Sequence, residues 1–339
     1  MSFVSYGRLR RPRSTGRARE RRALSASALP LFSTLAVSNT LEENRPGNRF
    51  KRAVVTLWRT PALNRAFNAT VRAAPAPVRR WVEQQRAHVR EAELRARIRE
   101  RRRLVPESPL RTLLSRGLRE LVDHCGKDGL GCYLEFGVYN GTSLLCMYRE
   151  LDALGLDQVR LFGFDSFQGL PPEAAIEDEG RWQPGRCHSP LDFTTAVLAS
   201  EGVDWNRVSL VPGWFNETLT PETRQTLGLR KASVIMIDCD LYSSSKQALE
   251  FCAPLIEDEA LLIFDEFHPR GLSGKYAGER RAFDEFLREQ GCFTAKPFGQ
   301  YAARTETFLI RRTHKAAETV IAHPAVQQFC VLSALTSAI

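Results

Sequence analysis

The sequence predicts an α/β protein built on a doubly wound, mostly parallel, seven-stranded Rossmann-like sheet with helices on both faces and a basic N-terminal extension. Two observations predict this fold. Short apolar segments alternate with helical patterns from residue 106 to residue 311, and such alternation is typical of parallel strands joined by helical crossovers. Three of these segments also end in acidic residues, which places carboxyl groups at the edge where such sheets bind ligands.

Charge divides the chain into parts. Residues 1–105 contain 25 Lys and Arg against 7 Asp and Glu, whereas residues 106–339 contain 23 against 32. We therefore expect a basic, disordered leader over 1–50, a basic helical extension over 51–105, one folded domain over 106–312 and a tail over 313–339. The mildly apolar run 23–37 would also suit a transit peptide, but the disordered leader is favoured.

Cysteine spacing and hydropathy exclude several classes of protein. The eight cysteines are scattered, with no C-x-x-C pair, which argues against a zinc site or a disulfide framework and favours reduced thiols in the cytoplasm. No apolar run in the sequence reaches the roughly 18 residues that a membrane span needs. We expect a cytoplasmic protein without a membrane span.

The extension is expected to contain helical fragments interrupted by Pro61, Pro75 and Pro77, followed by one long charged helix over residues 81–103. Apolar residues in that helix are too sparse to bury much surface, so it should be solvated or face a partner. These helices are candidate contacts of a homo-oligomer. The domain then opens with a helix capped by Ser108 and carrying Pro109 at its first position.

Residues 132–148 are the most informative stretch. The apolar segment 132–136 predicts a buried strand, Gly137 and Gly141 predict a turn, and the residues from Leu144 predict a helix capped by Thr142 and Ser143. A glycine turn before a helix N-terminus directs backbone N–H groups toward an anionic or polar ligand. The glycines should let that ligand approach the backbone. A dinucleotide fold would instead need G-x-G-x-x-G.

The remaining elements alternate along the chain. Strands are expected over residues 159–164, 208–211, 232–237 and 260–264, helices over 191–200, 221–227, 243–256 and 279–289, and a closing hairpin over 293–298 and 306–311. The long loop 171–190 after the second strand can cover the carboxyl edge of the sheet as a lid.

Acidic residues end three of the predicted strands. Asp165 follows the second strand, where nucleotide-binding sheets accept hydrogen bonds from a ribose diol. Asp238 ends one later strand, and Asp265 and Glu266 end the next. Converging carboxyl groups would repel one another unless a cation lies between them, and a hard divalent ion, Mg²⁺ first, suits oxygen ligands. In the competing interpretation, one or two of these acids point elsewhere as caps or ion-pair partners.

Four linked motifs resemble the macrocin O-methyltransferase family of class I methyltransferases. They are GFDSFQGLP (163–171), PGWFNETL (212–219), IDCDLY (237–242) and FDE (264–266), and they follow the turn motif E-x-G-x-x-x-G at 135–141. The resemblance covers residues 106–311. It implies an enzyme that depends on S-adenosylmethionine (SAM) and Mg²⁺ and that methylates a hydroxyl of a small molecule, such as a sugar of a natural product.

The resemblance also implies roles for individual residues. SAM would be held by Glu135, Gly137, Tyr139, Asn140, Gly141, Thr142, Ser143, Asp165 and Ser166, with Gly213 and Trp214 by the adenine. Asp238, Asp265 and Glu266 would hold Mg²⁺. Glu266 departs from the family, where a second Asp is usual, and the acidic run 257–259 replaces a usual Pro-Gly-Gly turn. The basic arm has no counterpart.

Methyl transfer to a hydroxyl benefits from a group that accepts the hydroxyl proton. His188, in the loop 171–190, is the first candidate for this general base, His268 is the second and Asp238 is the third. A bound Mg²⁺ would position the hydroxyl and stabilise the developing alkoxide. Trp182 and Trp214 are candidates for lining the acceptor pocket.

Three other functions stay open. A methyltransferase of RNA or protein would use the basic arm for binding, but the arm lacks interleaved aromatic residues and an RNA-module signature, so nucleic acid is not a favoured partner. A non-catalytic SAM-binding protein would have no need of every strand-end acid. An NAD-dependent dehydrogenase would need a third glycine in the turn.

Overall fold

The computed structural model describes residues 61–268 and 277–313, so the predicted leader and all but the first residue of the predicted tail lie outside the described residues. Contacts divide the chain into two compact units between Glu93 and Leu94. This boundary lies earlier than residue 106, where the folded domain is predicted to begin.

Helix α3 (Pro61–Ala73) begins at Pro61, and α4 (Ala76–Arg99) carries Pro77 in its first turn. The first turn of a helix tolerates proline because the missing N–H has no partner there, so these prolines begin helices instead of interrupting them.

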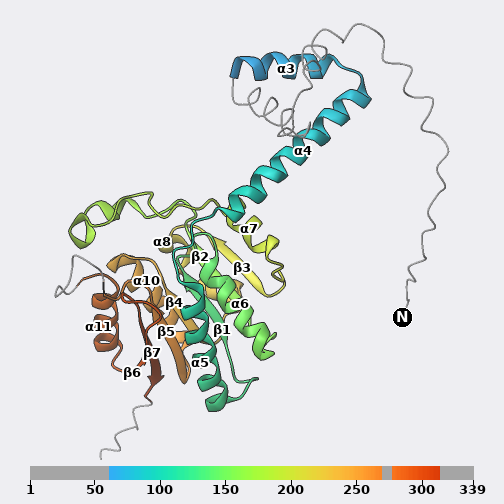
Figure 1. Cartoon of the computed structure of the whole chain (residues 1–339). Helices are drawn as coiled ribbons and strands as arrows, with labels where there is room; N and C mark the ends of the chain where they lie inside the picture. The colour runs from blue at the N-terminus through green and yellow to red at the C-terminus, as the bar shows by residue number, and fades with distance from the viewer. Residues whose placement is uncertain (1–60, 269–276, 314–339) are drawn as a thin grey trace, which may run out of the picture. The chain divides into compact units, whose positions relative to one another are not determined.

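The second unit contains the predicted sheet (Figure 1). Its strands are β1 (Cys132–Phe136), β2 (Leu161–Asp165), β3 (Val208–Pro212), β4 (Ala232–Ile237), β5 (Glu259–Phe264), β6 (Phe293–Gly299) and β7 (Glu306–Arg312), and within the described residues their order is β3-β2-β1-β4-β5-β7-β6. The first five strands are parallel, and the hairpin of β6 and β7 pairs antiparallel with β5. The strand order reverses between β1 and β4, the place where doubly wound sheets bind ligands.

Helices cover both faces of the sheet. They are α5 (Glu107–Cys125), α6 (Thr142–Leu154), α7 (Leu191–Ser200), α8 (Phe215–Thr218), α9 (Pro221–Thr226), α10 (Tyr242–Cys252) and α11 (Gly278–Gln290). One apolar core packs between the sheet and α5, α6 and α7, and a second packs between the sheet and α10 and α11. Successive residues of a strand point to opposite faces, so Tyr133 enters the first core and Leu134 the second. None of the described helices is both long enough and apolar enough to cross a membrane.

Two of the predicted helix caps are wrong. Ser108 lies within the first turn of α5, whose N-cap is Pro106. The N-cap of α6 is Gly141 in a left-handed conformation, without a side-chain cap, and glycine adopts that conformation more readily than a residue with a side chain. Thr142 and Ser143 are instead the first residues of α6, and their hydroxyls donate to Asn140 and Glu135.

Gly137 is required by the packing of the chain itself. Its φ is 91°, and a Cβ at this position would lie 1.8 Å from the carbonyl oxygen of Asp238. At Gly141 a Cβ would lie 2.8 Å from the Leu198 side chain of α7. The sequence predicts these two glycines as places where a ligand approaches the backbone. In the structure, the chain itself fills the space where their side chains would lie, with the residue after β4 at Gly137 and with α7 at Gly141.

Replacement of Gly137 by Ala should destabilise the protein much more than the same change at Gly202. Gly202 also has a positive φ, of 79°, but its Cβ would meet nothing within 4 Å, so its variant suffers only the left-handed backbone penalty of about 1–2 kcal/mol. The Gly137 variant must also move β1 from β4. Urea unfolding of the two variants measures the difference, and equal losses would contradict the packing argument.

Candidate functional site

A cavity of about 830 Å³ lies at the carboxyl edge of the sheet around the reversal point, within the usual range of ligand sites, about 300–1,000 Å³. Its wall includes nine of the residues predicted for the site, namely Gly137, Tyr139, Asp165, Ser166, Gly213, Trp214, Asp238, Asp265 and Glu266. Trp182 also lines it. Glu135, Asn140, Gly141, Thr142, Ser143 and His188 do not lie among the lining residues.

Asp165 fastens the turn after β1 to the turn after β2. Its Oδ2 accepts hydrogen bonds from the backbone N–H groups of Val138 and Tyr139, at 2.8 and 2.9 Å, and its Oδ1 accepts one from Phe167 at 2.7 Å. Burial raises the pKa of Asp165, and these three N–H donors oppose that rise. A carboxylate oxygen can accept more than one hydrogen bond, so Asp165 can hold this turn and also face a ligand.

Gly213 and Trp214 lie next to Asp165 along the cavity. β2 pairs with β3 up to Asp165 and Pro212, and the N–H of Gly213 donates to the backbone carbonyl of Asp165 at 3.0 Å. Ser166, which follows Asp165, uses its hydroxyl to bridge Gly169 and Gln168 within its own turn. The wall therefore presents a carboxyl group and then an indole ring in order from β2 to β3.

Glu135 lies behind the glycine turn and is fully buried. It accepts hydrogen bonds from the hydroxyls of Tyr133, at 2.5 Å, and Ser143, at 2.7 Å. Burial raises its pKa to about 7, although both hydroxyls oppose the rise. Glu135 and Ser143 therefore connect β1 to the start of α6, and any effect on a cofactor passes through the turn between them.

Three carboxyl groups are close together where β4 and β5 end. Burial raises the pKa of Asp238 well above its usual range, and the charge of Asp265 raises it further. Burial likewise raises the pKa of Asp240 to about 7, and the pKa of Asp265 is raised despite a hydrogen bond from the Tyr301 hydroxyl. Together these acids favour a proton or a cation at this edge.

Glu266 is held by two arginines. Arg304 forms a close ion pair with its Oε1, and Arg181 lies 3.9 Å from its Oε2. Among the described residues no group of three His, Cys, Asp or Glu side chains is arranged to hold a metal ion. Asp238 and Asp265 have the oxygen donors that Mg²⁺ prefers, whereas Oε1 of Glu266 is already paired with Arg304.

The loop over residues 171–190, called the lid from here on, covers the cavity as predicted. It contains the short helices η2 (Pro172–Ala175) and η3 (Glu177–Gly180). Glu177 accepts a hydrogen bond from the N–H of Ser243 in the first turn of α10, and Asp178 accepts one from Gly278 at the start of α11. An anion at a helix N-terminus is stabilising, so these acids attach the lid to two helices.

Neither histidine lines the cavity. His188 is an exposed residue of the lid whose charge acts on Asp165, and its neighbour Cys187 lies on the wall. His268 is paired through Nε2 with Glu306 at 3.2 Å. Of the three candidates for the general base, Asp238 is the one on the cavity wall.

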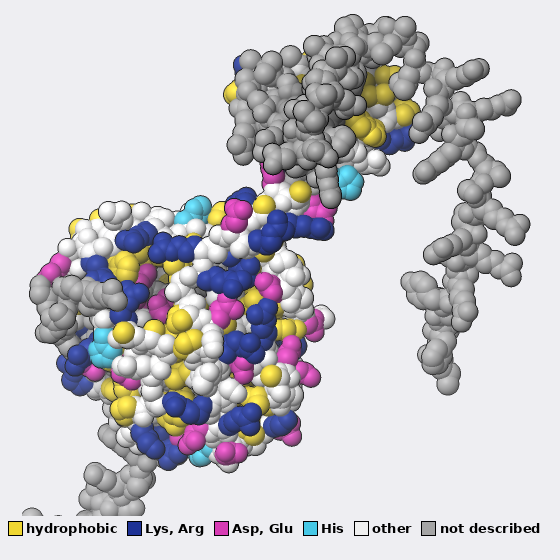
Figure 2. Space-filling view, viewed as in Figure 1, with side chains coloured by type: hydrophobic (Ala, Val, Ile, Leu, Met, Phe, Trp, Pro, Cys, Tyr) yellow, Lys and Arg dark blue, Asp and Glu magenta, His cyan; other side chains and the backbone are white. Residues whose placement is uncertain are grey.

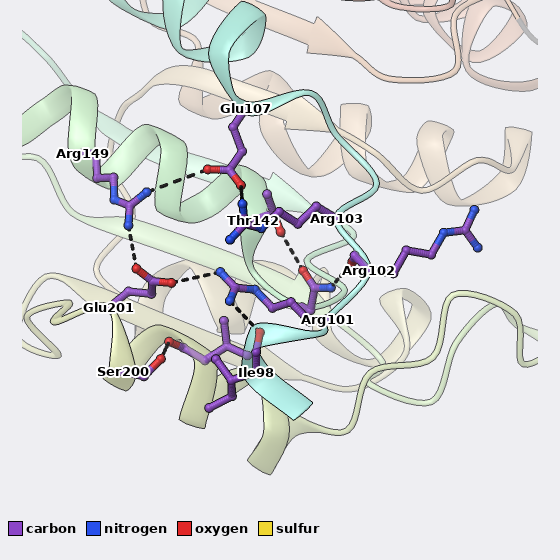
Figure 3. A network of polar contacts seen from close by, with 11 residues as sticks. Ile98, Arg101, Arg102, Arg103, Glu107, Thr142, Arg149, Ser200 and Glu201 are labelled. Atoms are coloured by element: carbon purple, nitrogen blue, oxygen red, sulfur yellow. Dashed lines mark hydrogen bonds and ion pairs between the residues drawn. The ribbon is translucent and has the colours of Figure 1, made fainter. Parts of the chain in front are cut away.

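The segment of residues 101–105, called the strap from here on, forms another part of the wall through Arg102 and Leu104. Figure 3 shows the polar network that holds it. Arg101 pairs at 3.0 Å with Glu201, the C-cap residue of α7, and Arg149 of α6 pairs with the same carboxylate at 2.6 Å. One acidic side chain thus joins the strap to α6 and to the end of α7.

Asn140 ties the strap to the glycine turn. Its amide donates to the backbone carbonyl of Arg102 at 2.6 Å, and it accepts a hydrogen bond from the Thr142 hydroxyl at 2.7 Å. Both side chains are buried. Their observed contacts are therefore with the chain, and they set the position of the strap over the turn.

Several wall residues were missed by the sequence interpretation. They are Arg102, Arg181, Arg186, Cys187, Asp240 and Arg304. Asp240 could have been found, because it lies within the motif IDCDLY two residues after Asp238. Arg102 could not, since it lies in a run of arginines that resembles any solvated helix end.

The chain matches a known family over most of its length. The family model described as Macrocin-O-methyltransferase (TylF) matches residues 52–294. This range begins within the predicted extension.

Individual relatives match over shorter spans. The 8-demethyl-8-(2,3-dimethoxy-alpha-L-rhamnosyl)-tetracenomycin-C 4'-O-methyltransferase of Streptomyces olivaceus is 31% identical over 148 residues, covering 41% of this chain and 54% of that protein. The demethyldecarbamoylnovobiocin O-methyltransferase of Streptomyces niveus is 27% identical over 156 residues, covering 43% and 56%. This chain therefore spans a little over half the length of these curated relatives. The structure of the O-methyltransferase NovP aligns at a TM-score of 0.49 with 19% identity, covering 60% of this chain and 80% of that one.

The buried Glu135 predicts a pH dependence of stability. The pKa of Glu135 is raised from 4.5 to about 7 in the folded chain. Its contribution to the free energy of unfolding is therefore fully present below pH 4.5 and is lost as the pH rises through about 7. The loss should amount to about 3 kcal/mol. Glu135→Gln should remove this part of the decline, as measured by urea unfolding between pH 5 and 7.5.

The matched control is Glu285→Gln. The pKa of Glu285 is lowered to about 2 by hydrogen bonds from Tyr242 and Arg281, so its contribution is lost only below pH 4.5 and the variant should follow the wild-type profile over pH 5–7.5. Parallel profiles of wild type and Glu135→Gln would show that Glu135 does not titrate in this range.

Proposed function

Because the chain belongs to the macrocin O-methyltransferase family, as its motifs predict, we propose that it transfers a methyl group from SAM to a hydroxyl of a small molecule, specifically a sugar of a natural product. The observation that supports this best is the cavity at the strand-order reversal, where Asp165, Trp214 and Asp238 line one space. A relative named for a substrate that contains a rhamnosyl group supports a glycosylated acceptor.

The order of wall residues supports one orientation of the cofactor. In this orientation the adenine lies against Trp214 after β3, and Asp165 after β2 accepts the ribose hydroxyls. The methionine part then points toward Gly137 and Tyr139 after β1. SAM supplies an electrophilic methyl group, so the chain itself has to orient the acceptor and exclude water.

The acceptor hydroxyl would lie between the cofactor and the ends of β4 and β5. Asp238 is our choice for the residue that takes its proton, since Asp238 is the one of the three candidates that lines the cavity. A positioned carboxylate within reach of the hydroxyl can act as the proton acceptor. His188 stays a prediction as the alternative base, which would require the lid to turn it inward.

Mg²⁺ is part of the proposal. Asp238 and Asp265 would hold the ion, and Glu266 would be a third ligand once it is released from Arg304. Bound there, the ion would polarise the acceptor hydroxyl. The like-charge repulsion between the two aspartates supports a cation at this place.

Partners other than the small molecule are less favoured. On the face shown in Figure 2, basic side chains of the second unit are interspersed with acidic ones, whereas nucleic-acid-binding surfaces gather basic residues. Cytoplasmic location and a homo-oligomer through the N-terminal helices stay predictions. The seven described cysteines are free thiols, which suits a reducing compartment.

The cofactor assignment predicts that Asp165→Ala weakens binding of S-adenosylhomocysteine (SAH). Loss of the ribose acceptor should raise the dissociation constant by about tenfold or more, as measured by calorimetry. Asp152→Ala, which removes a surface carboxylate of α6 paired with Arg207, should bind SAH as the wild type does.

The activity itself is tested by transfer of labelled methyl from SAM to a panel of deoxysugar glycosides. A wild-type chain that neither binds SAH nor labels any acceptor would refute the proposed function.

The metal assignment predicts that Asp238→Ala abolishes Mg²⁺ binding while leaving SAH binding largely intact. A Mg²⁺ titration of the SAH-loaded protein should release heat in the wild type and in Asp258→Ala, whose side chain is exposed in the turn before β5, but not in Asp238→Ala. An identical titration of all three proteins, or none in the wild type, would remove Mg²⁺ from the mechanism.

A further inference from the structure

The strap places three consecutive arginines in three different environments. Arg101 is committed to Glu201, and its guanidinium also donates to the backbone carbonyl of Ile98 at 2.9 Å. Arg103 is committed to Glu107 at 2.9 Å. Arg102 lies between them and lines the cavity. Figure 3 shows its side chain pointing away from the ion pairs of its two neighbours.

The backbone around Arg102 is fixed on both sides. Asn140 holds its carbonyl group to the glycine turn, and Val105 at the end of the strap is buried in the first core. No acidic side chain among the described residues lies within ion-pair distance of Arg102. The fold therefore anchors the segment firmly and leaves one guanidinium available at the cavity, directly beside the turn after β1.

The other arginines of the cavity wall either pair with an acidic side chain or belong to the lid. Arg181 and Arg304 pair with Glu266 at the end of β5, and Arg186 belongs to the lid. Two acidic wall residues contact the turn after β1: Asp165 accepts hydrogen bonds from the N–H groups of the turn, and the backbone carbonyl of Asp238 lies against Gly137. An anionic group of a ligand in this part of the cavity would need a cation, and Arg102 is placed to provide it.

The proposed cofactor has one anionic group, the carboxylate of its methionine part. With the adenine at Trp214 and the ribose at Asp165, the methionine part extends along the sheet edge toward Gly137, Tyr139 and the strap. We propose that Arg102 binds this carboxylate, so that the strap is part of the cofactor site. This assignment rests on the proposed function and names a SAM-binding residue outside the predicted motifs.

Two further features agree with the assignment. The N-terminus of α6 follows the same turn, and a helix N-terminus favours an anion. The charges of Arg102 and Asp165 both act on the Cys187 thiol, where burial is the main cause of a pKa raised to about 11. The guanidinium of Arg102 therefore extends to the same region of the cavity as the carboxyl group of Asp165. The fork of a guanidinium matches a carboxylate with two parallel hydrogen bonds.

The test compares two probes on the full chain by calorimetry. One is SAH, and the other is its decarboxylated analogue, which keeps the adenosine, the sulfur and the amine but lacks the carboxylate. The wild type should prefer SAH on the order of tenfold or more. Arg102→Gln should lose this preference by weakening SAH alone, and Arg102→Lys should restore part of it. The matched control Arg103→Gln should keep the full preference.

The possible outcomes are distinct. Equal weakening of both probes by Arg102→Gln would indicate a structural role and overturn the proposal, as would a preference that survives in this variant. A wild type that binds SAH and its analogue equally well would also overturn it, while leaving the proposed cofactor in place. A wild type that binds neither probe would refute the proposed function together with this inference.

Discussion

The buried carboxyl groups where β4 and β5 end impose the main physical constraint on this site. Asp265 and Asp240 raise the pKa of the buried Asp238, and Asp265 also raises that of Asp240. The fully buried Glu279 at the start of α11 adds a fourth carboxyl group, whose pKa is raised well above its usual range by burial and by Asp265. Such a cluster is stable only with protons or with positive charge nearby. Arg304 and Arg181 form their ion pairs with Glu266, and their charges only partly oppose the raised pKa of Asp240. The rest of the edge is therefore prepared for a cationic ligand, which fits both a sulfonium compound and a divalent ion.

The positions of these acids could be predicted because strand ends are visible in the sequence. The segments 232–237 and 191–200 were predicted with the bounds that the structure gives to β4 and α7. Once the strands are parallel, every residue that follows a strand lies at the same edge. Asp165, Asp238 and Asp265 therefore met at one cavity without any knowledge of the side chains around them.

The roles of the turn residues could not be predicted in the same way. Asn140 and Thr142 have the polar groups that a cofactor would use, but the partner of Asn140 is a carbonyl 38 residues earlier in the chain. Glu135 meets Tyr133 and Ser143 within the same local segment, yet only the burial of β1 shows that it faces protein. Arg102 was missed because the ion pairs that set its two neighbours apart from it are visible only in the structure: their acidic partners lie at the start of α5 and just after α7.

The attachment of the lid has a consequence for how such a protein can change. Glu177 and Asp178 bind backbone N–H groups of α10 and α11, and a backbone N–H is offered by every residue except proline. These two contacts therefore do not depend on the side chains of the helices, and the packing of Ala174 and Trp182 against Leu241 adds to them. Exposed lid residues away from the buried cluster of Ala174, Trp182 and Leu241 are the ones that can be exchanged most readily during evolution. A new acceptor could be accommodated by altering this one loop, with the sheet and its acidic edge left untouched.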